Sequence, residues 1–143
     1  MEKKEIKIYA LVLIVIGAII LAVTVFNTGG ENSIKRNFQK TNIKPGEIVT
    51  VTLDVSIASD GTFYAIEEYV PKGWTVINDG GGASGDSNIL KWVVIQNAEN
   101  TKYTYDLQAP NQEGDYTALG IYMFEGFTET KNTKGDNKIK VSS

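Results

Sequence analysis

The longest apolar run of the chain lies near its N-terminus and limits what that part of the chain can fold into. Residues 8–26 contain no charged side chain, and thirteen of the nineteen are Ile, Leu, Val or Phe. As an α-helix, at about 1.5 Å per residue, such a run reaches about 28 Å, close to the thickness of the hydrocarbon core of a bilayer. A soluble helix that is apolar on every face would need a larger surrounding core than this chain can supply. The run therefore predicts a transmembrane helix.

A cleaved signal peptide is the alternative for the same run. Its apolar region is usually about 7–15 residues long and ends in a small-x-small cleavage site. The run here is longer, and residues 23–27 (Val-Thr-Val-Phe-Asn) offer no such site. The sequence therefore favours a retained signal anchor that contacts membrane lipid through residues 8–26.

The charges beside the span predict its orientation. Lys3, Lys4 and Lys7 precede the run, and the positive-inside tendency places residues 1–7 in the cytoplasm as a short stub. Lys35 and Arg36 flank the predicted span on its far side. Residues 27–34 are mostly small and polar and predict a tether, so residues 35–143 are expected to form one extracellular domain on a single-pass cell-membrane protein.

The chain contains no His and no Cys. This excludes Ser-His-Asp and Cys-His nucleophiles, disulfides, zinc fingers and blue-copper sites, because each needs imidazole or thiolate. The formal net charge of -3 also argues against nucleic-acid binding. We expect no enzyme activity, no catalytic, cofactor-binding or metal-binding residues, no cofactor, no nucleic-acid partner and no small-molecule substrate.

Alternation of apolar and polar residues dominates the C-terminal part. Between Glu47 and Ile57 the odd-numbered positions from Val49 onward are apolar and the even-numbered positions from Thr50 to Ser56 are polar, which is the period of a half-buried strand. Residues 103–107 repeat the pattern. Further strands are predicted at residues 37–40, 62–70, 74–77, 89–95, 116–124 and 137–141.

These seven or eight strands are separated by Gly-, Pro- and Asp-rich turns, and no amphipathic helical pattern interrupts them. About a hundred residues with strands at this spacing predict an all-β, immunoglobulin-like or fibronectin-like sandwich of about seven strands, preceded by one N-terminal transmembrane or hydrophobic helix. Trp74 and Trp92 are expected in its core.

Several segments between Pro45 and Gly126 resemble one family. Its pattern is a Pro-Gly turn before a Val/Thr strand, a Tyr-Ala-hydrophobic-Glu step, Pro-x-Gly-Trp-Thr-Val, a Gly-rich loop, a strand with a central Trp, and a Thr-Tyr strand that ends in Ala-Pro. Here these are residues 45–46, 49–55, 64–67, 71–76, 80–82, 90–92, 103–107 with 109–110, and 114–120 for the last strand. The chain is thus similar to an Ig-like repeat of bacterial and archaeal cell-surface proteins. The resemblance implies a β-sandwich with a surface or scaffold role and no activity.

Two acidic features of the sequence could form sites. Glu67 and Glu68 could form a catalytic acid pair, but adjacent strand residues point to opposite faces, so one is expected outward and the other inward or toward an edge. In the resembled repeat the position of Glu67 recurs, which implies structural hydrogen bonding to turn backbone. Asp79, Asp86 and Asn88 lie in the Gly-rich loop of residues 78–88 and are oxygen ligands of the kind calcium takes, although a simple loop is favoured.

Two aromatic features also have alternative interpretations. The seven Tyr residues could form a carbohydrate platform, but their strand positions favour core packing. Residues 122–127 form the densest apolar stretch outside the predicted span, and they indicate a buried strand or an edge that pairs with a neighbour.

The sequence therefore predicts a membrane-anchored cell-surface protein whose Ig-like domain makes protein–protein contacts with envelope or surface-layer proteins, or with copies of itself. A subunit of a pilus-like or archaellum-like filament, with the hydrophobic helix in the fibre core, is the alternative. An accessory subunit of a membrane machine, with one helix and an Ig-like domain that grips the surface layer, is a variant of the first.

Overall fold

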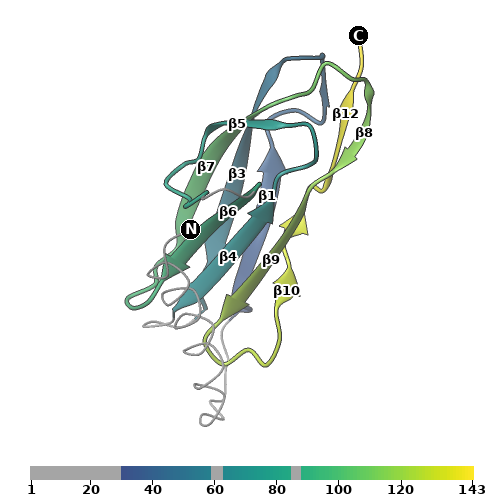
Figure 1. Ribbon diagram of the computed structural model, residues 1–143. Coiled ribbons are helices and arrows are strands. Elements are labelled where there is room, and N and C mark those ends of the chain that lie inside the picture. The colour runs from purple at the N-terminus through teal and green to yellow at the C-terminus, as the bar shows by residue number, and fades with distance from the viewer. Residues whose placement is uncertain (1–29, 59–62, 85–87) are drawn as a thin grey trace.

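The computed structural model describes residues 30–58, 63–84 and 88–143, and these residues form a sandwich of β-strands (Figure 1). Alternating sequences such as residues 48–56 become strands because their apolar side chains can be buried on one face only. Within the described ranges no helix is long and apolar enough to cross a bilayer. The predicted stub, the predicted span and residues 27–29 of the predicted tether lie outside the described residues.

One layer is a five-stranded sheet in the order β11-β1-β3-β7-β5. Its strands are β1 (Ser33–Phe38), β3 (Ile48–Ser56), β5 (Thr75–Asn78), β7 (Thr101–Gln108) and β11 (Lys134–Gly135). β3 lies at the centre and runs antiparallel to both β1 and β7.

The facing layer is a four-stranded sheet in the order β10-β9-β4-β6. Its strands are β4 (Tyr64–Tyr69), β6 (Ile89–Val94), β9 (Leu119–Phe124) and β10 (Lys131–Asn132). A third, smaller sheet extends one end of the sandwich, in the order β2-β12-β8. It is made by β2 (Asn42–Ile43), β8 (Gly114–Thr117) and β12 (Lys138–Val141).

The core lies between the two large sheets. β3 buries Val49, Val51, Leu53 and Val55, as its period predicts, and β4 buries Tyr64 and Ile66. Trp74 and Trp92 are also buried, which confirms their predicted place in the core. Residues 122–124 belong to a buried strand, since Tyr122 and Phe124 point inward and β9 is paired on both sides.

The domain begins before the predicted boundary at residue 35. β1 starts at Ser33, Ile34 is fully buried, and the Asn32 side-chain oxygen accepts a hydrogen bond from the backbone N–H of Ala58 (2.6 Å). Polar composition suggested a tether here, but pairing with β3 orders these residues.

The prediction of one strand over residues 116–124 was wrong, because the chain changes sheets at Ala118. β8 ends at Thr117 in the small sheet and β9 begins at Leu119 in the four-stranded sheet. The Ala118 N–H donates to the carbonyl of Asn137, and this bond fixes the switch. The short strands β2, β10 and β11 were not predicted.

The two lateral sides of the sandwich are closed differently. On one side residues 131–135 pass from the four-stranded sheet, through β10, to the five-stranded sheet, through β11. On the other side the Gly-rich loop after β5 packs on Trp92, whose indole N–H donates to the Gly80 carbonyl (3.3 Å). Gly80 has a positive φ of 62° and no room for a Cβ against the Thr104 carbonyl.

Candidate functional site

The alternation of the strands gives each large sheet an outer face, and the two outer faces differ in chemistry. We call the outer-facing residues of β1, β3 and β7 the polar face and those of β9, β4 and β6 the apolar face. The polar face consists of Ser33, Lys35, Asn37, Ile48, Thr50, Thr52, Asp54, Ser56, Lys102, Thr104, Asp106 and Gln108. The apolar face consists of Ala65, Glu67, Tyr69, Ile89, Lys91, Val93, Leu119, Ile121 and Met123.

Several side chains of the polar face bind one another. Thr50 Oγ1 donates to Asp106 Oδ1 (2.6 Å), and Asn37 Nδ2 donates to Asp54 Oδ2 (2.7 Å). Lys102 Nζ lies 2.8 Å from Asp54 Oδ1. Apart from Ile48 at one end of β3, this surface is that of an ordinary solvated sheet.

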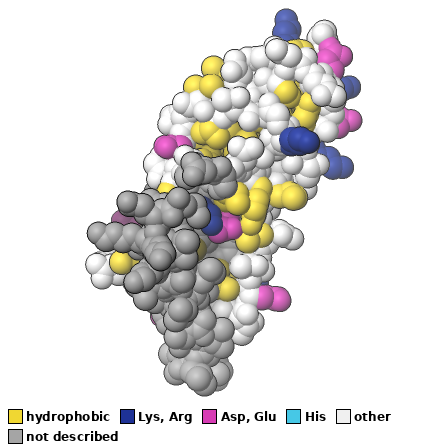
Figure 2. All heavy atoms as spheres, viewed as in Figure 1, with side chains coloured by type: hydrophobic (Ala, Val, Ile, Leu, Met, Phe, Trp, Pro, Cys, Tyr) yellow, Lys and Arg dark blue, Asp and Glu magenta, His cyan; other side chains and the backbone are white. Residues whose placement is uncertain are grey.

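The apolar face is arranged in three cross-strand rows. In the first row Tyr69 lies between Leu119 and Ile89, and in the third row Ala65 lies between Met123 and Val93. Leu119 is 62% exposed and Val93 is 48% exposed. Figure 2 shows hydrophobic side chains gathered over β4 and β9 beside an acidic and a basic side chain.

One ion pair occupies the middle row of the apolar face. Lys91 Nζ lies 2.7 Å from Glu67 Oε1, and the Tyr69 hydroxyl donates to Glu67 Oε2 (2.9 Å). The hydrogen bond to Glu67 raises the pKa of Tyr69, because it favours the protonated phenol. The pair is only partly exposed and is surrounded by apolar side chains, so the face carries one positive and one negative charge at its centre.

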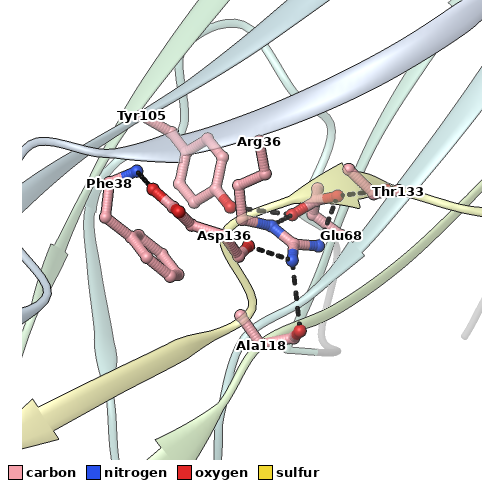
Figure 3. Close-up of polar contacts among 7 residues, drawn as sticks. All are labelled: Arg36, Phe38, Glu68, Tyr105, Ala118, Thr133 and Asp136. Carbon is pink, nitrogen blue, oxygen red and sulfur yellow. Dashed lines mark hydrogen bonds and ion pairs between the residues drawn. The ribbon is translucent and has the colours of Figure 1, made fainter.

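A second polar cluster lies inside the sandwich (Figure 3). Arg36 of β1 and Glu68 of β4 form a bidentate ion pair across the two sheets, with Nε–Oε2 at 2.7 Å and Nη2–Oε1 at 2.9 Å. Their side chains are 1% and 2% exposed. The pair is therefore almost completely removed from water.

The remaining guanidinium nitrogen and both carboxylate oxygens of this pair make further hydrogen bonds. Arg36 Nη1 donates to the carbonyls of Ala118 (3.1 Å) and Asp136 (3.0 Å). Glu68 accepts from the hydroxyls of Tyr105 (2.9 Å) and Thr133 (2.9 Å). These contacts tie β1, β4 and β7 to the segments that cross between sheets.

The surroundings shift two pKa values in this cluster. Burial disfavours the charged guanidinium, but the hydrogen bonds and charge of Glu68 outweigh it, so the pKa of Arg36 is raised. Burial, together with the negative charge of Glu68, raises the pKa of the Tyr105 hydroxyl well above its usual range. The cluster is buried and its groups are bound to one another, which makes it a structural element.

The predicted opposition of Glu67 and Glu68 is confirmed. Glu67 points outward and Glu68 inward, so the two carboxylates do not face a common substrate position. The implied role of Glu67 in bonding turn backbone was wrong, because its carboxylate accepts hydrogen bonds from the side chains of Lys91 and Tyr69. Arg36, interpreted from sequence as a charge beside the membrane, is instead the buried partner of Glu68.

Two of the three loop residues named as possible calcium ligands make local hydrogen bonds. Asp79 Oδ1 accepts from the Gly81 N–H (2.9 Å), and the Asn88 carbonyl accepts from the Val70 N–H (2.8 Å). Asp86 lies outside the described residues. In the described ranges no group of three or more His, Cys, Asp or Glu residues is placed to hold a metal ion.

Most described Tyr residues pack in the core, as predicted. Tyr64, Tyr105 and Tyr122 are buried, and Tyr103 stacks obliquely on Trp92 with ring centroids 5.4 Å apart. Tyr69 is the one that belongs to the apolar face. The apolar face itself was missed at the sequence level, although the apolar runs at residues 89–90, 92–95 and 121–124 signalled strands that are apolar on both sides.

No family model and no curated protein matches the chain. Among solved structures, the third ScaB cohesin of R. flavefaciens, in complex with a group 1 dockerin, is similar with a TM-score of 0.51 and 14% identity; the match covers 80% of this chain and 98% of that one. The reeler domain of human F-spondin gives a TM-score of 0.51 and 12% identity over 79% of this chain and 90% of that one.

These similarities define the class of protein by fold. The described part of the chain is an all-β sandwich of the Ig-like class, with the architecture of cohesin and reeler domains. At this identity the likeness concerns fold alone. Membership of the Pro-x-Gly-Trp-Thr-Val repeat family stays a prediction.

Proposed function

We propose that this protein is a membrane-anchored cell-surface interaction protein whose sandwich binds a protein partner through the apolar face. The observation that carries the proposal is the contrast between the two outer faces. Seven of the nine side chains of the apolar face are hydrophobic or aromatic, whereas eleven of the twelve on the polar face are hydrophilic, Ile48 being the exception. Exposed apolar patches rimmed by polar residues mark interaction sites.

The comparison adds support of a general kind. The similar ScaB cohesin is a sandwich whose structure is that of a complex with a dockerin. A sandwich of this class can therefore present a protein-binding surface. The role proposed here is binding without catalysis, and residues 8–26 serve as the anchor that holds the domain at the outer face of the cell membrane.

The size of the apolar face sets the expected strength of the interaction. Three strands about 4.8 Å apart, with outward residues about 6.8 Å apart along each strand, give a footprint of roughly 300 Å². A stable interface buries about 800 Å² on each partner. An interface limited to this face is therefore expected to be weak. A stronger interaction needs contacts outside the face, or confinement of both partners to the same membrane.

The test compares matched charge insertions on the two faces of the full-length chain in its native membrane. Leu119→Lys places a charge in the apolar face, and Thr104→Lys is the control on the polar face. We expect in-membrane cross-linking to capture a protein partner with the wild-type and Thr104→Lys chains and to lose it with Leu119→Lys. Circular dichroism of the purified variants checks that both remain folded.

Equal capture by all three chains would overturn the proposal that the apolar face is the binding surface. Negative-stain microscopy of the same preparations separates discrete complexes from fibres. Fibres that persist in wild type would favour the filament alternative over an interaction protein.

A further inference from the structure

We infer that the partner of the apolar face is a second copy of this chain, packed face to face about a two-fold axis that runs parallel to the strands between β4 and β6. This inference rests on the proposed function, because it uses the same face. It goes further by naming the occupant and the way in which the two surfaces meet.

The charges of the face are complementary to themselves under this rotation. The axis places each β4 residue of one copy opposite the β6 residue that is its register partner, now supplied by the other copy. Glu67 then faces Lys91 of the second copy, and Lys91 faces its Glu67. Two opposite-charge contacts form across the interface, and no like charges are brought together.

The apolar side chains of β4 and β6 match under the same rotation, and β9 lies beside this direct overlap. Tyr69 of one copy faces Ile89 of the other, and Ala65 faces Val93. On β4 the large ring of Tyr69 and the small Ala65 lie on either side of Glu67. The contact therefore has a large side chain at one end of this strand and a small one at the other. Packing two sheets with their strands nearly aligned is the common arrangement of β-sandwiches.

The direction of the axis also suits two anchored copies. The strands run along the long axis of the molecule, and β1 enters at the end opposite the C-terminus (Figure 1). A rotation about an axis parallel to the strands keeps the entry ends of both copies on the same side. A perpendicular axis in the plane of the face would turn one copy upside down and would bring Glu67 over Glu67.

Edge-to-edge pairing of two β6 strands is the competing arrangement, and the Gly-rich loop obstructs it. The Ala83 N–H donates to the Lys91 carbonyl (2.9 Å), and the Lys91 N–H donates to the Ala83 carbonyl (3.1 Å). The edge of β6 is therefore already paired at its middle. The face beside it carries no such cover among the described residues.

The first experiment reverses the charges one at a time in the full-length chain in detergent micelles or lipid nanodiscs. Glu67→Lys gives two positive charges on each face, and Lys91→Glu gives two negative charges. We expect each variant alone to self-associate roughly tenfold or more weakly than wild type, because like charges meet. An equimolar mixture should regain association, because every contact then joins opposite charges.

The readout is the dimer fraction by sedimentation or by energy transfer between labelled copies. Recovery in the mixture is the signature of direct contact between Glu67 and Lys91 of different copies, and damage to folding would not produce it. If the mixture associates no better than either variant alone, the inference is overturned.

The second experiment uses the absence of cysteine from the chain, so that every disulfide is an introduced one. Chains carrying Ala65→Cys are mixed with chains carrying Val93→Cys in the same membrane and oxidised. We expect a disulfide-linked dimer from this mixture and not from a mixture of Thr52→Cys and Thr104→Cys, which oppose each other on the polar face. The two cysteines are kept on separate chains because residues 65 and 93 are also partners within one chain.

Equal cross-linking of the two pairs would overturn the inference. Its failure is distinguishable from failure of the proposed function. If Leu119→Lys abolishes capture of another protein while all cysteine mixtures stay monomeric, the face binds a different partner. If Leu119→Lys leaves capture unchanged and the cysteine mixtures also stay monomeric, the apolar face is not a binding surface.

Discussion

Glu67 and Glu68 are neighbours in β4, and they lie on opposite faces of the same sheet in different physical environments. Glu68 is bound to Arg36 at 1–2% exposure, whereas Glu67 is bound to Lys91 at a partly exposed surface. In both ion pairs a carboxylate oxygen lies 2.7 Å from a nitrogen of the basic side chain. The difference teaches that burial, and not the type of contact, decides how much an ion pair contributes to holding the fold.

The largest difference should come from removing one carboxylate at a time. Glu68→Ala leaves the buried Arg36 charge without its counter-ion, and we expect the free energy of unfolding to fall by about 3–5 kcal/mol. Glu67→Ala on the outer face should lower it by less than about 1 kcal/mol. Trp74 and Trp92 are both buried, so denaturant unfolding followed by tryptophan fluorescence reports on the sandwich.

If Glu68→Ala does not fold, the double variant Arg36→Met/Glu68→Leu provides the measurement. It removes both charges, and we expect it to recover part of the loss, because no buried charge is left without a counter-ion. The carbonyls of Ala118 and Asp136 still lose their donor, and the hydroxyls of Tyr105 and Thr133 lose their acceptor. Equal effects of Glu68→Ala and Glu67→Ala would contradict the comparison.

A smaller loss of stability is expected from adding a methyl group next to the buried Arg36–Glu68 pair. The added Cβ of Gly120→Ala would meet the Glu68 carboxylate, the Arg36 guanidinium and the Thr133 hydroxyl. We expect a loss of about 1–3 kcal/mol, the usual cost of overpacking. Gly30→Ala is the matched control, since nothing lies within 4 Å of its Cβ position, and its unfolding midpoint should not move. A neutral Gly120→Ala would mean that the cluster can shift to make room.

Alkaline pH should lower the free energy of unfolding through Tyr105, whose hydroxyl is bound to the buried Glu68. Its pKa is raised in the folded protein, so its contribution to stability is complete below about pH 10, where unfolded Tyr titrates, and is lost as the pH rises above that value. Tyr105→Phe should lower stability by about 1–2 kcal/mol at neutral pH, because it removes a hydrogen bond to a carboxylate. It should also make the alkaline decline shallower.

The measurement is the free energy of unfolding against pH for wild type and Tyr105→Phe. Tyr69→Phe serves as the control from the outer face, and its neutral-pH loss should be smaller because its hydroxyl is less buried. Identical alkaline slopes for wild type and Tyr105→Phe would show that Tyr105 does not contribute.

The smallest effect is expected on the outer face itself. Glu67→Gln combined with Lys91→Gln should change the free energy of unfolding of the monomer by less than about 1 kcal/mol, and added salt should reduce the difference. Dilute protein is used, so that association does not add to stability. A loss as large as that of Glu68→Ala would show that the outer pair also holds the fold.

The core strands could be predicted because their signals are local. Residues 48–56 and 101–108 alternate, and this alternation alone fixes which side chains enter the core. The sandwich class follows from the number of such strands. The break at Ala118 could not be predicted, because it depends on bonds to Asn137 and Arg36, both distant in sequence.

The inner cluster was also beyond sequence reasoning. Arg36 and Glu68 are 32 positions apart, and nothing local distinguishes a buried Arg from a solvated one. β10 and β11 contain polar residues without a period, and they form only because β9 and β1 offer them backbone partners. The apolar face was visible in part, since Leu119, Ile121 and Met123 occupy outward positions where an ordinary solvated strand has polar residues.

β1, the first described strand, should resist a force that is applied along its length. β1 pairs with β3 through six register positions, from Ser33↔Ser56 to Phe38↔Val51. A pull on the chain at Gly30 acts along this strand and shears all of its hydrogen bonds together, instead of opening them one after another. The Arg36–Glu68 ion pair opposes such sliding, because a shift of β1 by one position would move the guanidinium away from Glu68 in the opposite sheet.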